Sequence, residues 1–203
     1  TDIFATNENE DLLTIASDKA AAIKAPVDFS MIRFEDNAFD AVLADASFVR
    51  PSEIESFIEN TIRVARTGGD IAIFLPTAGS FGEIFSLLWE AFFNEDLADH
   101  GPAVETLISE LPTVSRIEEL ARRYDLVNVN TQLAVELFEY DNGTEFIESP
   151  LIADFLMPVW LETLAPHEKE RVVKQLAQLI DAEDGKITFR FSVKATLLTG
   201  EKG

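Results

Sequence analysis

The sequence is poor in the residues that carry disulfide, redox and metal chemistry, because it has no cysteine and only two histidines among 203 residues. Without thiols the chain can form no disulfide bond, supply no thiolate nucleophile and bind no metal through cysteine. His100 and His167 have no carboxylate or hydroxyl partner at a motif spacing, and His167 follows a proline in the first turn of a predicted helix, so we interpret His167 as a solvated surface residue. The acidic residues lack the spacing of a calcium-binding loop, and no metal site is predicted.

Basic side chains are also scarce. The chain has 16 Lys and Arg residues against 37 Asp and Glu residues, which gives a net charge of -21. A surface this acidic repels phosphate backbones and anionic lipid headgroups, so we expect neither a nucleic acid nor a membrane as partner. High solubility is the simplest role of this charge. A small molecule, neutral or cationic, or a basic protein is compatible with it, and the oligomeric state stays open.

Long apolar segments are missing as well. No apolar run is long enough to span a bilayer, and the N-terminus lacks the basic and apolar segments of a signal peptide, so we expect a cytoplasmic protein. We find no internal repeat and no linker. The length fits a single domain covering residues 1–203, and a hydrophobic content of 47% suffices for a sizeable core.

The segment from Phe34 to Pro76 is the most informative part of the chain. A polar turn leads through Phe39-Asp40 into an apolar run, and a second apolar run occupies residues 71–75. Between them, apolar residues recur at helical spacing from residue 54 to residue 65, and Gly68-Gly69 offers the positive φ with which a helix commonly ends. Unbroken apolar runs are typical of central parallel strands. The segment therefore predicts a strand–helix–strand unit of a parallel sheet.

Weaker patterns predict the remaining elements. Apolar and polar residues alternate from Ile187 to Leu197, which predicts a strand that pairs antiparallel at a sheet edge with one face in solvent. Pro158 should kink or break a helix over residues 151–164. The other predicted elements are strands at 2–5, 27–31, 126–130 and 133–140, and helices at 8–24, 80–93, 115–124 and from residue 166 onward.

The order of elements in residues 34–76 resembles the middle of the class I S-adenosylmethionine-dependent methyltransferases. In that family "P-F-x-x-x-x-F-D-x-V" and "R-V-L-x-P-G-G" occupy the places that Phe34 to Val42 and Arg63 to Gly69 take here. The resemblance implies an α/β fold, a three-layer Rossmann-like methyltransferase sandwich with a mostly parallel sheet and an antiparallel strand near the C-terminus. It also implies S-adenosylmethionine as cofactor and methyl transfer to a small-molecule or protein acceptor.

The resemblance also indicates which residues would bind this cofactor. In the family, an acidic residue at the end of one strand binds the ribose hydroxyls, and that position falls on Asn7, with the neighbouring Glu8 as a substitute. Asp45, Ala46 and Ser47 end the strand that should border the cofactor, at the edge where open α/β sheets bind ligands. Alternatively, Asp45 and Ser47 only complete a loop and cap a helix.

A glycine-rich loop, which holds the cofactor in the family, is not evident in the sequence. The run from Gly79 to Gly82 follows the wrong strand and lacks the dinucleotide spacing. Either the central strand lies upstream of Thr1, or residues 1–7 form a first strand beside a degenerate cofactor site. Two functions follow. One is an S-adenosylmethionine-dependent methyltransferase with no predicted catalytic side chain, and the other is a catalytically inactive module that serves in binding or scaffolding.

Overall fold

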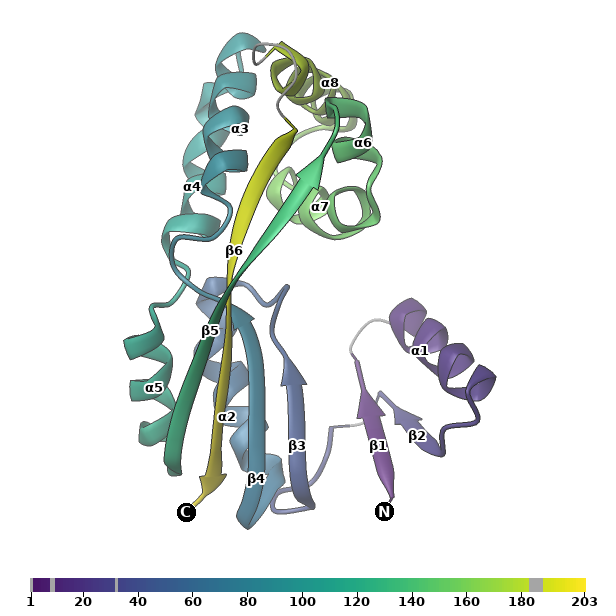
Figure 1. The fold of residues 1–203 in the computed structure, drawn as a ribbon, viewed down its shortest axis with the longest axis vertical. Helices are drawn as coiled ribbons and strands as arrows, with labels where there is room; N and C mark the ends of the chain where they lie inside the picture. The colour runs from purple at the N-terminus through teal and green to yellow at the C-terminus, as the bar shows by residue number, and fades with distance from the viewer. Residues whose placement is uncertain (1, 8–9, 32, 183–187) are drawn as a thin grey trace.

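The computed structural model describes residues 2–7, 10–31, 33–182 and 188–203. Strands and helices alternate in the first half of the chain. In the second half, most helices come after β5 and before β6 in the sequence (Figure 1). None of the helices in the described ranges combines the length and the apolar character needed to cross a membrane. The elements are, in order, β1 (Ile3–Thr6), α1 (Glu10–Ala22), β2 (Val27–Ser30), β3 (Phe39–Asp45), η1 (Pro51–Glu53), α2 (Ile54–Val64), β4 (Ala65–Pro76), α3 (Gly82–Asn94), η2 (Ala98–His100), α4 (Gly101–Ser109), α5 (Val114–Arg123), β5 (Leu126–Tyr140), α6 (Gly143–Glu148), η3 (Leu151–Leu156), α7 (Met157–Trp160), α8 (Pro166–Ala182) and β6 (Phe189–Lys202).

The strands of the described residues form two separate sheets. In the larger sheet the order is β3-β4-β6-β5: β3 pairs parallel with β4, whereas β6 pairs antiparallel with both β4 and β5. In the smaller sheet β1 pairs parallel with β2. The Rossmann-like α/β class is confirmed, but the expectation of a mostly parallel sheet is wrong, because the long strands β5 and β6 add antiparallel pairing and make the larger sheet mixed.

The alternating segment that ends near Leu197 forms an inner strand, β6, and not the edge strand that its pattern predicts. Its backbone pairs on both sides, and Phe191 and Leu198 are fully buried. Its polar residues find partners inside the protein: Thr196 Oγ1, for example, lies 3.0 Å from Thr77 Oγ1. The alternation of apolar and polar residues therefore predicted the antiparallel pairing of β6 correctly, but it did not predict that β6 is an inner strand. Ile187, the first residue of the predicted strand, lies outside the described residues.

Two hydrophobic cores lie on opposite faces of the larger sheet. Helices α2 and α5 pack over Ile73 and Leu198, near the end of the sheet that carries the chain's C-terminus. Helices α3, α6 and α8 pack around Phe191, near the other end (Figure 1). Because Leu198 and Phe191 are seven positions apart in one strand, their side chains point to opposite faces. We call the second region, residues 82–109 with residues 143–182, the helical lobe.

Helix α2 confirms the predicted helix but ends earlier than expected. Isoleucines at every fourth position from 54 to 62 are buried against the sheet. The helix ends at Val64, and β4 begins directly at Ala65. The predicted helix stop lies within the strand, where Gly68 has a φ of 72° and the pairing with β3 shifts its register. The two glycines therefore form a β-bulge, a second setting in which a positive φ is needed.

The predicted helix over residues 151–164 is helical from Leu151 to Trp160 and changes its type just before Pro158. Its first part is the π-helix η3, and its second part, α7, ends at Trp160. Proline has no amide hydrogen to donate to the preceding turn, and a wider turn ahead of it is one way in which a helix accommodates this.

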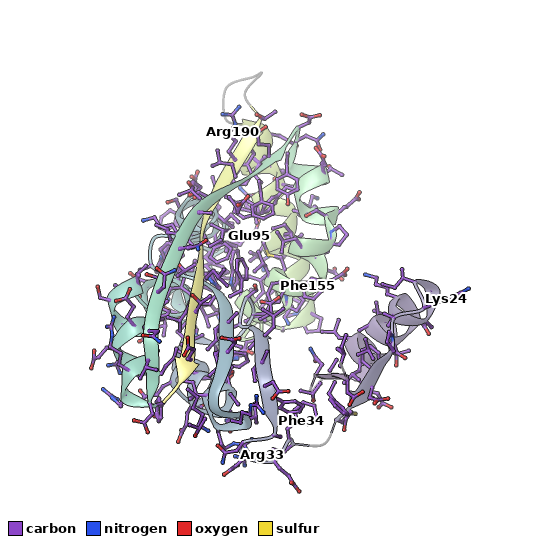
Figure 2. All side chains as sticks on the ribbon, turned by 60° about the horizontal axis from the view of Figure 1, so that its bottom comes forward. Lys24, Arg33, Phe34, Glu95, Phe155 and Arg190 are labelled. Carbon is purple, nitrogen blue, oxygen red and sulfur yellow. The ribbon has the colours of Figure 1, made fainter. Side chains whose placement is uncertain are left out.

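The first unit, β1–α1–β2, lies to one side of the larger sheet (Figure 1). Helix α1 has no buried side chain. The ring of Phe4 in β1 lies 5.8 Å from the ring of Phe39 in β3, which is a direct contact between the unit and the larger sheet. Figure 2 shows Lys24 at the far side of this unit and Phe34 in the segment that leads to β3.

Candidate functional site

The carboxyl ends of three parallel strands point toward the end of the molecule that carries the helical lobe. β1 ends at Thr6, β3 at Asp45 and β4 at Pro76, and their arrows run in one direction (Figure 1). Ligands of open α/β sheets bind at this edge. Of the residues that the sequence assigns to the cofactor, Asn7 directly follows β1, and Asp45 to Ser47 lie at the end of β3, at the expected edge.

Asp45, Ala46 and Ser47 form a turn that is fixed by local hydrogen bonds. Asp45 Oδ1 accepts one hydrogen bond from the Ser47 backbone N–H at 2.8 Å and one from the Ser47 hydroxyl at 2.5 Å. Ala46 is 1% exposed, and its N–H donates to the Phe74 carbonyl at 2.7 Å. Neither polar residue caps a helix, since η1 begins only at Pro51. The turn holds an exposed carboxylate in one orientation, and its role in cofactor binding stays a prediction.

Asn7 directly follows β1 and has an exposed side chain. Glu8, its predicted substitute, lies outside the described residues. An amide offers one acceptor oxygen and a donor group where a carboxylate would offer two acceptors, so Asn7 can make fewer hydrogen bonds to a pair of ribose hydroxyls. Among the described residues no strand lies between β1 and β3, and the place of the family's glycine-rich loop is not filled by any of them (Figure 1).

A cavity of about 290 Å³ lies between the loop that follows β3 and the helical lobe. Its walls come from residues 50–52, from α4 and from residues 159–163 around the end of α7. Sequence reasoning missed this cavity because its walls are far apart in the chain. Trp160 was the one available signal. Its side chain is 6% exposed and also lines the cavity.

Two contacts join the loop after β3 to the helical lobe. The guanidinium of Arg50 forms two hydrogen bonds with the carboxylate of Glu162, one of them 2.9 Å long. These hydrogen bonds lower the pKa of Glu162 and raise that of Arg50. Nearby, the rings of Phe48 and Phe155 stack with their centroids 4.8 Å apart. The loop that begins at the predicted cofactor edge is therefore fixed against the lobe.

A second hollow, of about 490 Å³, lies on the other side of the larger sheet, away from α2 and α5. Residues of all four strands of this sheet line it, among them Leu43, which is 82% exposed. Its position on a sheet face, rather than at the carboxyl ends of strands, makes it a weaker candidate for the cofactor.

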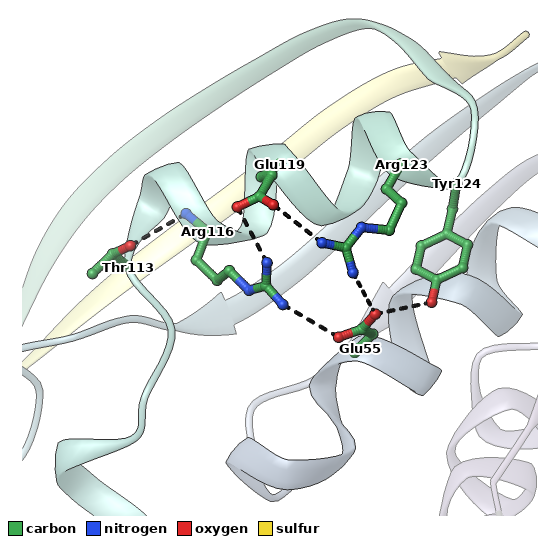
Figure 3. A network of polar contacts seen from close by, with 6 residues as sticks. All are labelled: Glu55, Thr113, Arg116, Glu119, Arg123 and Tyr124. Carbon is green, nitrogen blue, oxygen red and sulfur yellow. Dashed lines mark hydrogen bonds and ion pairs between the residues drawn. The ribbon is translucent and has the colours of Figure 1, made fainter.

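The network of polar contacts in Figure 3 joins α5 to α2. Glu55 of α2 accepts hydrogen bonds from Arg116, from Arg123 at 2.9 Å and from the hydroxyl of Tyr124 at 3.1 Å. Burial is the main cause that raises the pKa of Tyr124, and the hydrogen bond to Glu55 adds to it. Glu119 bridges Arg116 and Arg123 along α5 (Figure 3). The network lies beside the α2–α5 core, and we interpret it as structural.

The described residues contain no group of three or more acidic or histidine side chains placed to hold a metal ion. His100 is half-buried, and its Nδ1 lies 3.0 Å from Thr163 Oγ1. This partner is 63 positions away, so no local spacing reveals it. His167 is exposed, as expected.

Comparison with known proteins gives a clear result for the fold. No protein-family model and no curated protein match the sequence. Among solved structures, the putatively assigned methyltransferase BH2331 of Bacillus halodurans C-125 aligns with a TM-score of 0.59 and 14% identity over 100% of this chain and 83% of its own. YcgJ of Bacillus subtilis aligns with a TM-score of 0.57 and 13% identity over 99% of this chain and 82% of its own. The chain therefore has the fold of the class I S-adenosylmethionine-dependent methyltransferases.

Proposed function

We propose that this chain is an S-adenosylmethionine-dependent methyltransferase domain that transfers a methyl group to a small-molecule or protein acceptor. The observation that carries the proposal is the position of Asn7 and of the Asp45–Ser47 turn at the carboxyl ends of parallel strands in a methyltransferase-like fold. In the same proposal, α2 and α5 form one outer layer of a three-layer sandwich, and α1 and the helical lobe belong to the other. We place the protein in the cytoplasm.

The residues at this edge fit part of the cofactor. The Asp45 carboxylate and the Asn7 amide are exposed and can hydrogen-bond to ribose hydroxyls. The backbone amides of a glycine-rich loop, which would bind a carboxylate group, are not found beside β1 or β3 in the described part of the chain. The site is therefore incomplete or degenerate within these residues, and we expect weaker binding than a complete site would give.

When bound, S-adenosylmethionine would supply a methyl group activated by a sulfonium charge. The chain's own contribution would be to hold the two reactants in line and to exclude water, since proximity and orientation alone lower such a barrier substantially. The Asp45–Ser47 turn would orient the cofactor side. The loop fixed by the Arg50–Glu162 pair would orient the acceptor side. No side chain needs to act as an acid or base for the transfer itself.

Calorimetric titration with S-adenosylmethionine and S-adenosylhomocysteine tests this function. We expect dissociation constants of about a micromolar, or about -8 kcal/mol. Asp45→Asn should weaken binding about tenfold, because an amide replaces a charged acceptor. Asp141→Asn is the matched control, since Asp141 is an exposed carboxylate in the turn after β5 and lines neither hollow.

Two results would contradict the proposal. Loss of binding by both variants to the same extent would remove Asp45 from the site. The absence of any binding, in the protein with its natural N-terminus, would favour the catalytically inactive binding module instead.

A further inference from the structure

We propose that the cavity of about 290 Å³ beneath the helical lobe binds a small organic amine in its protonated form, with an apolar group beside the charge. This inference goes beyond the proposed function, because it depends on the cavity's own residues and not on cofactor binding. The volume is close to the lower end of the range for small-molecule sites.

The cavity has an apolar wall that is rigid. Leu107 of α4 and Val159 and Trp160 of α7 supply it. The ring of Trp160 packs edge to face against the ring of Phe81, with the two centroids 5.5 Å apart. An indole offers both apolar area and a favourable surface for a cation. The wall therefore suits a compact hydrocarbon group joined to a positive charge.

The charges around the cavity leave an excess of negative charge. Three charged residues line it: Arg50, Glu110 and Glu162. Arg50 and Glu162 neutralise each other through their paired hydrogen bonds, and Arg50 keeps the pKa of Glu162 below its usual range. Glu110 forms no ion pair within the described ranges of the chain. Its carboxylate is thus the charge that a ligand would meet, and it favours a cation.

The ends of the surrounding helices favour the same sign. The cavity runs along α4 from Ala103 in its first turn to Glu110 just past its end, and it also meets Trp160 at the end of the four-residue helix α7. The carbonyl groups at a helix C-terminus carry partial negative charge and stabilise nearby cations. The start of η1 also borders the cavity, but its first residue, Pro51, has no amide hydrogen, and the N–H of Glu53 donates to the carbonyl of Arg50 at 2.8 Å. The opposing contribution for anions is therefore small.

An anionic ligand would face two costs. It would have to compete with Glu162 for the guanidinium of Arg50, which already makes two hydrogen bonds to that carboxylate. It would also approach a chain with a net charge of -21. The competition for Arg50 and the repulsion by the net charge both favour an amine over a carboxylic acid of the same size and shape.

A matched pair of probes tests this inference. Phenethylamine and 3-phenylpropionate have the same ring and similar chain lengths, and at pH 7 they carry opposite charges. We expect calorimetry to give a dissociation constant for the amine at least about tenfold lower than for the carboxylate, equivalent to about 1.4 kcal/mol. Glu110→Gln should weaken amine binding about tenfold, whereas Glu105→Gln, an exposed residue of the same helix outside the cavity lining, should not.

Three outcomes would overturn the inference: equal affinities for the two probes, equal effects of the two glutamate variants, or no binding of the amine. Both variants should keep the thermal midpoint of the parent protein, because both residues are exposed, so a loss of binding reports on the site and not on folding. The titrations contain no S-adenosylmethionine. A failure here therefore leaves the proposed methyltransferase function untouched, and a failure to bind the cofactor leaves this site untouched.

Discussion

The units β1–α1–β2 and β3–α2–β4 have the same order of elements, and each pairs its two strands in parallel, but they differ in what surrounds them (Figure 1). Helix α2 buries Ile54, Ile58 and Ile62 between the larger sheet and α5. Helix α1 buries no side chain. The comparison shows that a strand–helix–strand pattern gives the local structure, whereas the neighbouring strands and helices give the stability.

The reason lies in the width of each sheet. β1 and β2 are four residues long and pair with each other alone among the described strands. A two-stranded sheet has too little area to bury the apolar stripe of a helix, and such pairs are marginal by themselves in water. β3 and β4 continue into β6 and β5, so α2 has a broad surface below it and a second helix beside it.

Isoleucine-to-alanine substitutions in α2 and α1 should give the largest difference between the two units, measured as the change in unfolding free energy. Ile58→Ala removes a fully buried side chain, and we expect a loss of about 2–5 kcal/mol of unfolding free energy. Ile15→Ala, in α1, removes a side chain that is 50% exposed and should change the unfolding free energy by less than about 0.5 kcal/mol. Urea denaturation followed by circular dichroism measures both. Similar losses would mean that α1 packs against a surface as completely as α2 does.

Hydrogen exchange should show the same contrast within one molecule. We expect the amides of α2 to exchange at least about a hundredfold more slowly than those of α1, equivalent to about 2.7 kcal/mol of opening free energy. Phe39→Ala removes the ring that Phe4 contacts, so it should speed exchange in β1 and leave the α3 amides unchanged. Uniform protection across α1 and α2 would contradict the difference between the units.

The smallest effect concerns the polar network that holds α5 to α2. In a Tyr140→Phe background, where Tyr124 is the remaining tyrosine, spectroscopic titration should give a pKa above that of free tyrosine, and Glu55→Gln should lower it. The folded chain favours the neutral phenol. Its contribution to stability is therefore complete below pH 10.0 and is lost as the pH rises toward the folded-state pKa. An unchanged pKa in Glu55→Gln would exclude the hydrogen bond as a cause.

The sequence carried enough information for the α2 region because its signals are local. The isoleucines of α2 recur with the period of a helix, and the apolar run of β4 has the character of a buried strand. Gly68-Gly69 was misinterpreted because a positive φ serves equally in a helix stop and in a bulge, and only the pairing with β3 distinguishes them. The position of β6 inside the sheet depends on partners more than 100 residues away in β4, which no local pattern encodes.

Of the two candidate sites, only the one that depends on local sequence signals was predicted. Asp45 and Ser47 were predicted because they follow an identifiable strand directly, and the structure shows them at the expected edge. The cavity that Arg50, Glu110 and Glu162 line was not predicted, because it exists only once the loop after β3 meets two helices of the lobe. The sequence shows the charge of each residue. It does not show that Arg50 pairs with Glu162 and leaves Glu110 available to a ligand.

The central position of β6 has a consequence for the order in which this chain folds. During synthesis, residues 189–202 are made after the other strands that the structure describes, yet they bridge β4 and β5 and contribute Phe191 to one core and Leu198 to the other. Until they emerge, β4 and β5 have no backbone partner on that side and neither core is complete. Contacts of such long sequence separation slow folding and leave strand edges exposed meanwhile. A ribosome-bound chain that stops at residue 182 would therefore hold its helices over an unfinished sheet, and the last strand would complete both cores together.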